Sequence, residues 1–489
     1  MIVRDDVPTQ VQDVADALEN AGFEAYLVGG CVRDLIMGGT PKDWDITTNA
    51  VPEEIIALFS ETYYTNEYGT VGVVQETEDE RLRVIEVTPY RTESEYSDAR
   101  RPDKVEFGAS LEEDLRRRDF TINAIAYRLK DKSLVDLFDG IKDIKDKRLR
   151  TVGAATDRFA EDALRMMRAV RLAVEFNLTI EAETMSAIAE NAPNLSRIST
   201  ERIRDELIRI LMSSQPMQGI IFLEKLQLLP HIMPELLDGV DVKQNQAHAF
   251  DVYEHLLRTL QHAADKKCPL ELRLAALLHD IGKPASRRWS DEKKDWTFHG
   301  HEVIGAKMAR NILKRLYFSR ETIETVISLV RWHMFFSDPD QITLSAVRRT
   351  IRNVGTESIR DLLTLRMCDR IGTGRPKEQP FRFRKYTSMV DEALRDPISV
   401  AMLKIDGTRI MELSDEKPGP KLGHTLHALL EEVLDDPSKN TPEYLEKRAV
   451  ELLTLPKEDL IRLGEAGKDR REEEETEAVK GLRRKHKVV

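Results

Sequence analysis

The stretch YLVGGCVRDLIMGGTPKDWDITTNA, residues 26–50, carries the pattern on which the fold prediction depends. A short apolar run ends at Gly29 and Gly30, and a helix-forming segment follows. Glycines at such a turn let backbone N–H groups approach a phosphate closely, and the start of the following helix favours an anion. Arg33 in that helix is suited to a two-point grip on a triphosphate. The pattern therefore predicts a strand, a turn and a helix, with a phosphate site at the turn.

Two aspartates, Asp43 and Asp45, follow on the next predicted strand. Side chains two positions apart point to the same face of a strand, so both carboxylates are expected in one site. Paired carboxylates bind Mg²⁺ ions that also contact substrate phosphates, and two such ions activate a hydroxyl and stabilise leaving pyrophosphate. A glycine pair or a DxD pair alone is a weak signal, but both in this order predict nucleotidyl transfer. Glu86, on the predicted strand 82–91, is a candidate third carboxylate, with burial at a sheet edge as the equal alternative.

The bulk composition narrows the class of protein. The chain has 489 residues, 41% hydrophobic and 33% charged, which predicts a globular protein of two to four domains. No apolar run reaches the roughly 18 residues of a membrane span, and the first residues do not resemble a secretory signal. The three cysteines are too far apart for a disulfide framework, so a cytoplasmic location is expected. The net charge of −12 does not itself indicate a nucleic-acid binder, but local arginine clusters leave room for a basic surface.

Residues 26–50 resemble the first motif of the class II tRNA nucleotidyltransferase and bacterial poly(A) polymerase family, within the polymerase-β superfamily. The resemblance implies an α+β fold, in which a polymerase-β-like nucleotidyltransferase head with a small mixed or antiparallel sheet precedes an all-α neck, an HD domain and a helical body. The segment 199–211 matches the family's neck helix. The predicted domains are the head at 1–150, the neck for base selection and RNA binding at 151–235, the HD domain at 240–375, the C-terminal body at 376–464 and a charged tail at 465–489.

The segment RRDFTINAIAY, residues 117–127, resembles the second motif of the family. The resemblance implies that Arg118 contacts the nucleotide's phosphates. Asp119 would accept hydrogen bonds from ribose hydroxyls, which favours ribonucleotides, and Asn123 would reach the same region. The structural alternative is an Arg–Asp salt bridge that caps a helix.

The segment EDALRMMRAVR, residues 161–171, resembles the motif that selects the base. Asp162 and Arg165 are three positions apart, which places them side by side on one helix face. Cytosine and adenine each show an amine donor beside a ring-nitrogen acceptor, so one carboxylate and one guanidinium read both bases, whereas uracil and guanine leave the pair unsatisfied. Arg168 and Arg171 would face the triphosphate or support the pair. An ordinary ion pair is the structural alternative.

Three further segments resemble parts of the same family. Residues 136–153 resemble the motif that joins head to neck, with structural roles for Asp139 and Arg150. Residues 88–115 resemble the flexible loop of enzymes that add a complete CCA sequence, which favours CCA or A addition over CC addition. Residues 400–455 resemble the C-terminal region that contacts tRNA.

A second set of motifs, between residues 251 and 372, resembles an HD-superfamily metal-dependent phosphohydrolase; it includes DVYEHLLRTL, LRLAALLHDIGKP, FHGHEVIGA, VRWHMFF and LRMCDRIG. The ligand set that the resemblance implies is His255, His279, Asp280 and Asp369, with His301 and His333 extending it to two metals. His299 competes with His301, which we prefer because HExxGA begins there as in the family. Such ligands suit Mn, Fe, Ni, Co or Mg, so a divalent transition metal is expected.

The prediction from sequence is an RNA nucleotidyltransferase that needs no template and adds C and A, from CTP and ATP, to the 3′ end of tRNA with Mg²⁺ in the head. A second, phosphohydrolase activity is expected in the HD domain. The nearest alternative is a poly(A) polymerase or an enzyme that adds only A. The alternative of another class is an HD phosphohydrolase whose head merely binds nucleotides. A non-catalytic RNA-binding module is disfavoured by the intact acidic residues, and the sequence leaves the oligomeric state open.

Overall fold

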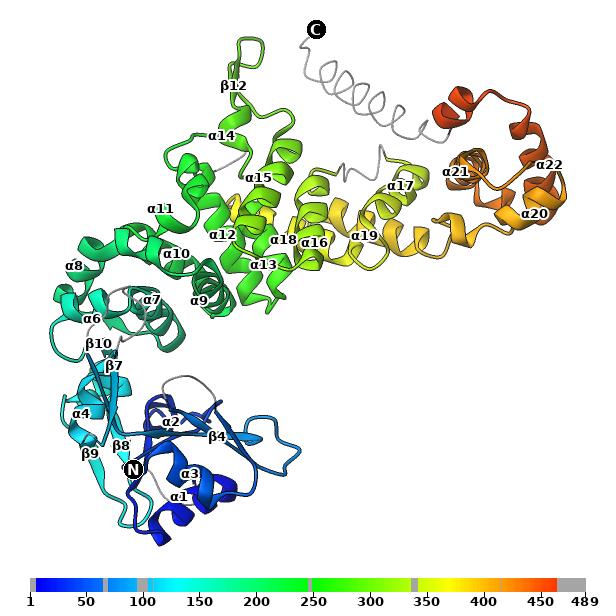
Figure 1. Ribbon diagram of the computed structural model, residues 1–489. Coiled ribbons are helices and arrows are strands. Elements are labelled where there is room, and N and C mark those ends of the chain that lie inside the picture. The colour runs from blue at the N-terminus through cyan, green and yellow to red at the C-terminus, as the bar shows by residue number, and fades with distance from the viewer. Residues whose placement is uncertain are drawn as a thin grey trace. The chain divides into compact units, whose positions relative to one another are not determined.

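The structure is a computed structural model that describes residues 6–64, 69–94, 104–108, 110–244, 249–335, 342–414 and 416–463. The chain divides into two compact units, one of residues 1–238 with 312–318 and one of residues 239–311 with 319–489 (Figure 1). The middle of the predicted loop at 88–115 and the predicted charged tail at 465–489 lie outside the described residues.

A mixed sheet forms the beginning of the first unit. Its seven described strands lie in the order β3-β4-β5-β2-β1-β8-β9. The central pair β2–β5 is parallel and the other described pairs of this sheet are antiparallel. The strands are β1 (Ala25–Val28), β2 (Asp45–Thr48), β3 (Thr62–Tyr64), β4 (Val71–Val74), β5 (Val84–Pro89), β8 (Ile125–Tyr127) and β9 (Leu134–Asp136). The predicted α+β head with a small mixed sheet is thus confirmed.

Short helices accompany this sheet, and two shorter strand pairs complete the region. Helix α1 turns its apolar face, which includes Val14 and Leu18, inward. Arg150, predicted to be structural, donates to the Asp143 carboxylate and to the Phe138 carbonyl, while Asp139 adopts a left-handed backbone before α5. The elements are α1 (Thr9–Asn20), α2 (Gly30–Ile36), α3 (Pro52–Leu58), α4 (Leu111–Arg116), the 3₁₀ helix η2 (Thr121–Asn123), α5 (Gly140–Lys145), β6 (Arg91–Ser94), β7 (Lys104–Phe107), β10 (Arg148–Leu149) and β11 (Thr179–Ile180).

The rest of the first unit is helical, as we predicted for the all-α neck. Helix α9 packs on α7, with Ser199 at its N-cap. The single helix that we predicted to carry Asp162 and Arg165 is interrupted, because the chain leaves helical geometry at Asp162. The helices are α6 (Ala155–Glu161), α7 (Leu164–Phe176), α8 (Ala182–Asn191), α9 (Thr200–Met212), α10 (Pro216–Lys225) and α11 (Leu229–Ile232).

The second unit begins with a helical layer in which α12 contacts both α13 and α18. Gly372 makes the close approach of α18 to α12 possible, because a Cβ there would lie 2.1 Å from Thr259 Oγ1. The elements are α12 (Val252–Asp265), α13 (Leu270–Leu278), α14 (Lys283–Ser286), β12 (Arg288–Ser290), β13 (Asp295–Thr297), α15 (His301–Arg315), α16 (Arg320–Trp332), α17 (Leu344–Val354) and α18 (Ile359–Gly372).

Four more α-helices follow among the described residues, held partly by ion pairs. Arg349 of α17 contacts Glu431 and Asp435 of α21. The helices are α19 (Phe381–Ala393), α20 (Gly407–Glu412), α21 (Pro420–Asp435) and α22 (Pro442–Leu453). Among the described residues, none of the helices has the length and apolar character to cross a membrane.

Candidate active site and metal centre

The glycine turn of the head lies against charged side chains, as its sequence predicts for a ligand site. Gly29 has a φ of +80°, a conformation that L side chains rarely adopt. A Cβ there would lie 3.2 Å from Arg118 Nη1 and 3.6 Å from Asp45 Oδ2, and one on Gly30 would lie 3.5 Å from Arg33 Nη2. Two guanidinium groups therefore flank the turn, with a carboxylate beside them.

Carboxylates gather next to this turn on two adjacent strands. Asp45 begins β2 and is the register partner of Glu86 on the parallel strand β5. Asp43 lies in the bend before β2, so the prediction that both aspartates lie on one strand is wrong. Burial, followed by the charge of Glu86, raises the pKa of Asp45 to about 6, although Arg118 opposes the rise. Burial and Asp43 also raise the pKa of Glu86. Three mutually repelling carboxylates fit a divalent cation, which would relieve the repulsion.

The predicted phosphate-binding arginines are held in place by other side chains. Arg33 donates to Asn123 Oδ1 at 2.7 Å, and its guanidinium carbon lies 4.2 Å from the centroid of the Phe176 ring. Arg118 donates to the buried carboxylate of Asp114 at 3.1 Å. These contacts orient both guanidinium groups at the turn before a ligand arrives.

Asp119, the predicted ribose contact, lies in a buried hydrogen-bond network. Its carboxylate accepts from Arg168 Nη2 at 2.6 Å and from Asn123 Nδ2 at 3.1 Å. Burial alone would raise the pKa of Asp119, but Arg168 and Asn123 hold that pKa below its ordinary value. Asn123 also accepts from Arg33, so one chain of contacts joins the second predicted motif to the first. The role of Asp119 toward ribose stays a prediction.

Asp162 and Arg165 do not share a helix face, so this part of the prediction is wrong. Asp162 is the C-cap residue of α6, and its Oδ1 accepts at 2.9 Å from the N–H of Leu164, the first residue of α7. Its Oδ2 accepts from Arg202 Nη2 of α9 at 2.8 Å. Arg165 instead donates to Glu161 Oε2 at 2.5 Å. An aspartate competes for backbone N–H groups, which favours a cap over a helix interior.

Arg171 supports the helix packing rather than an open nucleotide site. Its side chain is buried and contacts Glu206 of α9 at 2.8 Å and Glu175 at 3.6 Å. We predicted that Arg168 and Arg171 face the triphosphate or support the Asp162–Arg165 pair. In the structure, Arg168 lies in the Asp119 network and Arg171 forms this ion pair between α7 and α9. Arg202 was missed by sequence reasoning, because nothing local connects it to a carboxylate 40 positions away.

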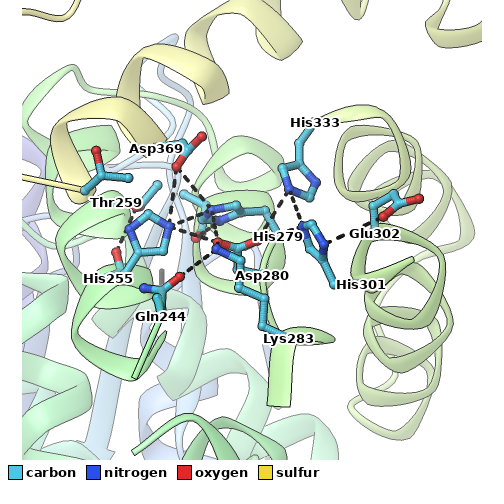
Figure 2. A network of polar contacts seen from close by, with 12 residues as sticks. Gln244, His255, Thr259, His279, Asp280, Lys283, His301, Glu302, His333 and Asp369 are labelled. Carbon is cyan, nitrogen blue, oxygen red and sulfur yellow. Dashed lines mark hydrogen bonds and ion pairs between the residues drawn. The ribbon is translucent and has the colours of Figure 1, made fainter. Parts of the chain in front are cut away.

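In the second unit, four histidines and two aspartates from separate segments meet in the interior (Figure 2). They form two groups, His255 with His279 and Asp369, and Asp280 with His301 and His333. In each group the three candidate ligand atoms lie within 4.8 Å of one another. His299 is exposed, whereas its competitor His301 belongs to the second group.

Asp280 lies between the two groups and contacts both. Its Oδ2 is 3.1 Å from His255 Nε2, and its Oδ1 is 3.1 Å from His301 Nε2. The Nδ1 atoms of His279, His301 and His333 lie 2.9, 2.6 and 2.7 Å from backbone carbonyls three residues earlier. These contacts favour the tautomer that carries its proton on Nδ1, which leaves each inward Nε2 lone pair available to a metal.

The electrostatics of this centre also fit cations. Burial alone would lower the pKa of His279, but Asp280 and Asp369 raise it to about 9. Burial lowers the pKa of His333. Despite burial, Lys283 and His279 hold the pKa of Asp280 well below its usual range. Imidazole nitrogens and carboxylate oxygens in two adjoining buried groups fit a pair of divalent metal ions.

Sequence reasoning assigned no role to Lys283 or Gln244, which also belong to this network (Figure 2). Lys283 Nζ lies 2.6 Å from Asp280 Oδ2 and 2.6 Å from Gln244 Oε1, and both side chains are buried. The lysine follows Asp280 by three positions, a spacing visible in the quoted HDIGKP run. Gln244 carries no such local signal.

Three family models match the chain: the poly A polymerase head domain over residues 25–150, the probable RNA and SrmB-binding site of polymerase A over 177–239, and the HD domain over 252–371. The fold and the matched domains thus define a nucleotidyltransferase head joined to an HD domain. The CCA-adding enzymes of Leuconostoc mesenteroides and Ligilactobacillus salivarius are each 34% identical to the chain, over 90% of it and 95% of their own length. The chain belongs to the family of CCA-adding enzymes, which confirms the prediction from its motifs.

Solved structures agree with this assignment. A crystal structure of the Bacillus stearothermophilus CCA-adding enzyme in complex with CTP matches with a TM-score of 0.67 and 27% identity, over 91% of this chain and 98% of that one. The Thermotoga maritima CCA-adding enzyme complexed with tRNA shares the fold, with a TM-score of 0.56 and 19% identity over 91% and 95% of the two chains.

Proposed function

We propose that the head adds cytidine and adenosine from CTP and ATP to the 3′ end of tRNA, and that it does so in the cytoplasm. The observation that carries the proposal is the Gly29–Gly30 turn, with Arg33 and Arg118 on its flanks and the Asp45–Glu86 register pair beside it. Guanidinium and carboxylate groups thus lie side by side, which supports the proposal because nucleotidyl transfer needs groups that bind phosphate and metal. Family relatives named for CCA addition support the choice of product.

In this mechanism the RNA 3′-hydroxyl attacks the α-phosphate of the nucleotide in line, and pyrophosphate leaves. Arg33 and Arg118 would hold the triphosphate, while Asp43, Asp45 and Glu86 would hold Mg²⁺. When bound, the ions supply charge stabilisation on both sides of the transferred phosphorus. Asp119 and Asn123 would position the sugar, and Arg165 would donate to the ring nitrogen of the base while Asp162 accepts from its amine.

Base reading in this form requires a rearrangement of contacts. Asp162 is bound to Arg202 and Arg165 to Glu161, so both partners must yield part of their hydrogen bonding to a base. These two ion pairs hold the Asp162 carboxylate and the Arg165 guanidinium group on either side of the start of α7 until a base competes for their hydrogen bonds.

The experiment tests three substrates: tRNA lacking CCA, tRNA ending in CC and an unrelated RNA. Each RNA is incubated with every labelled nucleotide singly and with all nucleotides together, and the products are sequenced. CCA on the first and A on the second is the expected result. Untemplated A runs on all three RNAs would identify a poly(A) polymerase, and addition only to tRNA ending in CC would identify an A-adding enzyme. No addition to any RNA would leave the head as a nucleotide-binding module.

We also propose a second activity, hydrolysis of a phosphoester at the HD centre, by family resemblance a 2′,3′-cyclic phosphate or a 2′-nucleotide. The two adjoining buried ligand groups favour it. Divalent transition metals would be held by His255, His279 and Asp369 on one side and by His301 and His333 on the other, with Asp280 between. When bound, they supply Lewis-acid activation of water and phosphate. Lys283, fixed by Gln244, would keep Asp280 oriented.

The test offers cyclic phosphates with Mg²⁺, Mn²⁺, Ni²⁺ and Co²⁺ in turn. Changing His279 and Asp280 together to alanine should remove hydrolysis and spare nucleotide addition. If no metal supports hydrolysis and the purified protein retains none of these ions, the HD domain is a scaffold for RNA instead.

A further inference from the structure

A two-stranded hairpin, β12 and β13, lies in the chain between Asp280 and His301, which belong to the HD centre. It extends beyond the neighbouring helices of its unit (Figure 1). A hairpin without further strands is marginally stable in water. Its position, between two metal-ligating segments, ties its ends to the centre.

The hairpin displays aromatic rings with a cation against them. Trp289 and Trp296 are direct cross-strand partners whose ring centroids lie 5.2 Å apart, edge to face. The guanidinium carbon of Arg287 lies 3.7 Å from the centroid of the Trp296 ring. Trp289 remains 52% exposed although its indole N–H donates to Asp291 Oδ1 at 3.1 Å. A ring that is fixed in place and half exposed is preorganised to stack.

Aromatic and cationic groups continue from the hairpin to the metal centre. Phe298 directly follows β13, and its carbonyl oxygen lies 2.6 Å from His301 Nδ1. Lys283 Nζ lies 5.6 Å from the centroid of the Phe298 ring and 2.6 Å from Asp280 Oδ2. Phe298 is buried and ties the hairpin to the metal centre, so we call Arg287, Trp289 and Trp296 the aromatic track. His301 follows Trp296 by five positions, so their Cα atoms are at most about 18 Å apart, a distance that a short strand of nucleotides bridges.

Cross-strand packing alone would explain the Trp289–Trp296 pair, but it does not explain the exposed ring or the cation of the track. Aromatic rings combined with cations are the surface on which single-stranded nucleic acids bind, because every base has a π-face that stacks and every phosphate is an anion. A flat protein partner would need a wider apolar patch than one half-exposed ring. The chemistry therefore favours RNA, which is also the proposed substrate of the head.

We propose that the aromatic track binds single-stranded RNA and leads its end to the HD centre, so that the substrates of this centre are phosphoesters at RNA ends and not small base-free esters. The inference rests on the proposed phosphohydrolase function and adds its substrate class. Stacking on Trp289 supplies affinity upstream of the reacting phosphate, while the guanidinium group of Arg287, over the Trp296 ring, attracts the backbone.

The experiment measures hydrolysis by the full chain of two substrates, an RNA oligonucleotide with a terminal 2′,3′-cyclic phosphate and ribose 2′,3′-cyclic phosphate without a base. Trp289→Ala should raise the KM for the oligonucleotide about tenfold, which is typical for the loss of one stacked base, and leave the KM for the base-free substrate unchanged. Trp289→Phe keeps an aromatic ring and should retain most of the affinity. Lys293→Ala, a change at the exposed hairpin turn, is the matched control and should behave as the unaltered protein.

A second measurement does not depend on hydrolysis. A 4-thiouridine oligonucleotide, irradiated with the protein in EDTA and mapped by mass spectrometry, should crosslink to the peptide that contains Trp289, and Trp289→Ala should reduce this crosslink but not crosslinks in the head. No crosslink there, or equal KM values for Trp289→Ala and the unaltered protein, would overturn the inference and leave the hydrolase proposal standing. A crosslink without hydrolysis under any metal would support the track as an RNA site and contradict the hydrolase proposal.

Discussion

The two candidate metal sites of this chain differ in how far the protein alone assembles them. In the second unit, three candidate ligand atoms meet within 4.8 Å in each of two buried groups. Among the described residues the head has no group that meets this criterion, although Asp45 and Glu86 are register partners on adjacent strands. Asp43 is exposed, and Asp45 and Glu86 are half-buried.

The difference has a physical origin in the elements that carry the ligands. Helices that pack around a common core force histidines and aspartates inward, where the buried carboxylates need a cation to neutralise them. Asp45 and Glu86, on two adjacent parallel strands, stay partly in water, so a metal and nucleotide phosphates are needed to complete the site. The head therefore suits a metal that arrives with its substrate, and the HD centre suits a resident metal.

The largest expected effect separates the two sites. Changing Asp43 and Asp45 together to alanine should lower nucleotide addition by about a thousandfold or more, because charge stabilisation by the ions is lost. Hydrolysis at the HD centre should continue at the unaltered rate. Radiolabelled addition assays and circular dichroism on the same sample measure activity and fold. Normal addition by the folded double variant would contradict the two-metal assignment.

Within the HD centre, single changes should show which residue joins the two groups. Asp280→Ala should remove both metals, because its two oxygens face different groups, whereas His301→Ala should weaken only one site. We expect the affinity of each lost site to fall by about 100-fold or more. Metal analysis after dialysis counts the bound ions. An equal loss of one metal in both variants would show that Asp280 does not bridge.

Base selection in the head tests the rearrangement of Asp162 and Arg165. Arg165→Ala should raise incorporation of UMP or GMP relative to CMP and AMP by about 5- to 150-fold, equivalent to about 1–3 kcal/mol of lost discrimination. Arg202→Ala, which frees Asp162, should change discrimination less and lower the overall rate. Competition assays with mixed nucleotides measure the ratio. An unaltered CTP/UTP ratio in Arg165→Ala would place base selection elsewhere.

The smallest effect is on the stability of the metal-free head. The pKa of Asp45, about 6 against an ordinary value of 3.8, means that the folded state binds this proton more tightly than the unfolded state. Stability is therefore lost as the pH rises from about 4 through 6, and the full cost is present above pH 6. In EDTA, Asp45→Asn should be more stable by about 1 kcal/mol at pH 7.5, because one pKa unit is worth about 1.4 kcal/mol and the half-buried site is partly screened by water.

Denaturant unfolding at pH 7.5 and pH 4 measures this difference, which should vanish at the lower pH. The Asp13→Asn variant, a change at an exposed position of α1, is the control for a simple change in net charge. A stability gain for Asp45→Asn that is equal at both pH values would show that the carboxylate's ionisation is not its cause.

Some features of the sites follow from short patterns in the sequence. The Gly29–Gly30 turn before a helix, with Asp45 at the start of the next strand, appears in the structure as the spacing predicts. The prediction from the Asp162–Arg165 spacing was wrong, because helical periodicity in the sequence continues through the position where α6 ends and α7 begins.

What the sequence alone determined are the features that depend on neighbours along the chain: the mixed-sheet head followed by helices, the phosphate turn, and the order of the HD motifs. The tertiary structure decided which distant groups meet. It set Glu86 beside Asp45 through strand register, joined Arg202 to Asp162 through helix packing, and divided the HD ligands into two groups around Asp280. The reason is physical: periodicity and turn chemistry act over a few residues, whereas these contacts arise only when burial of apolar faces brings separate elements together.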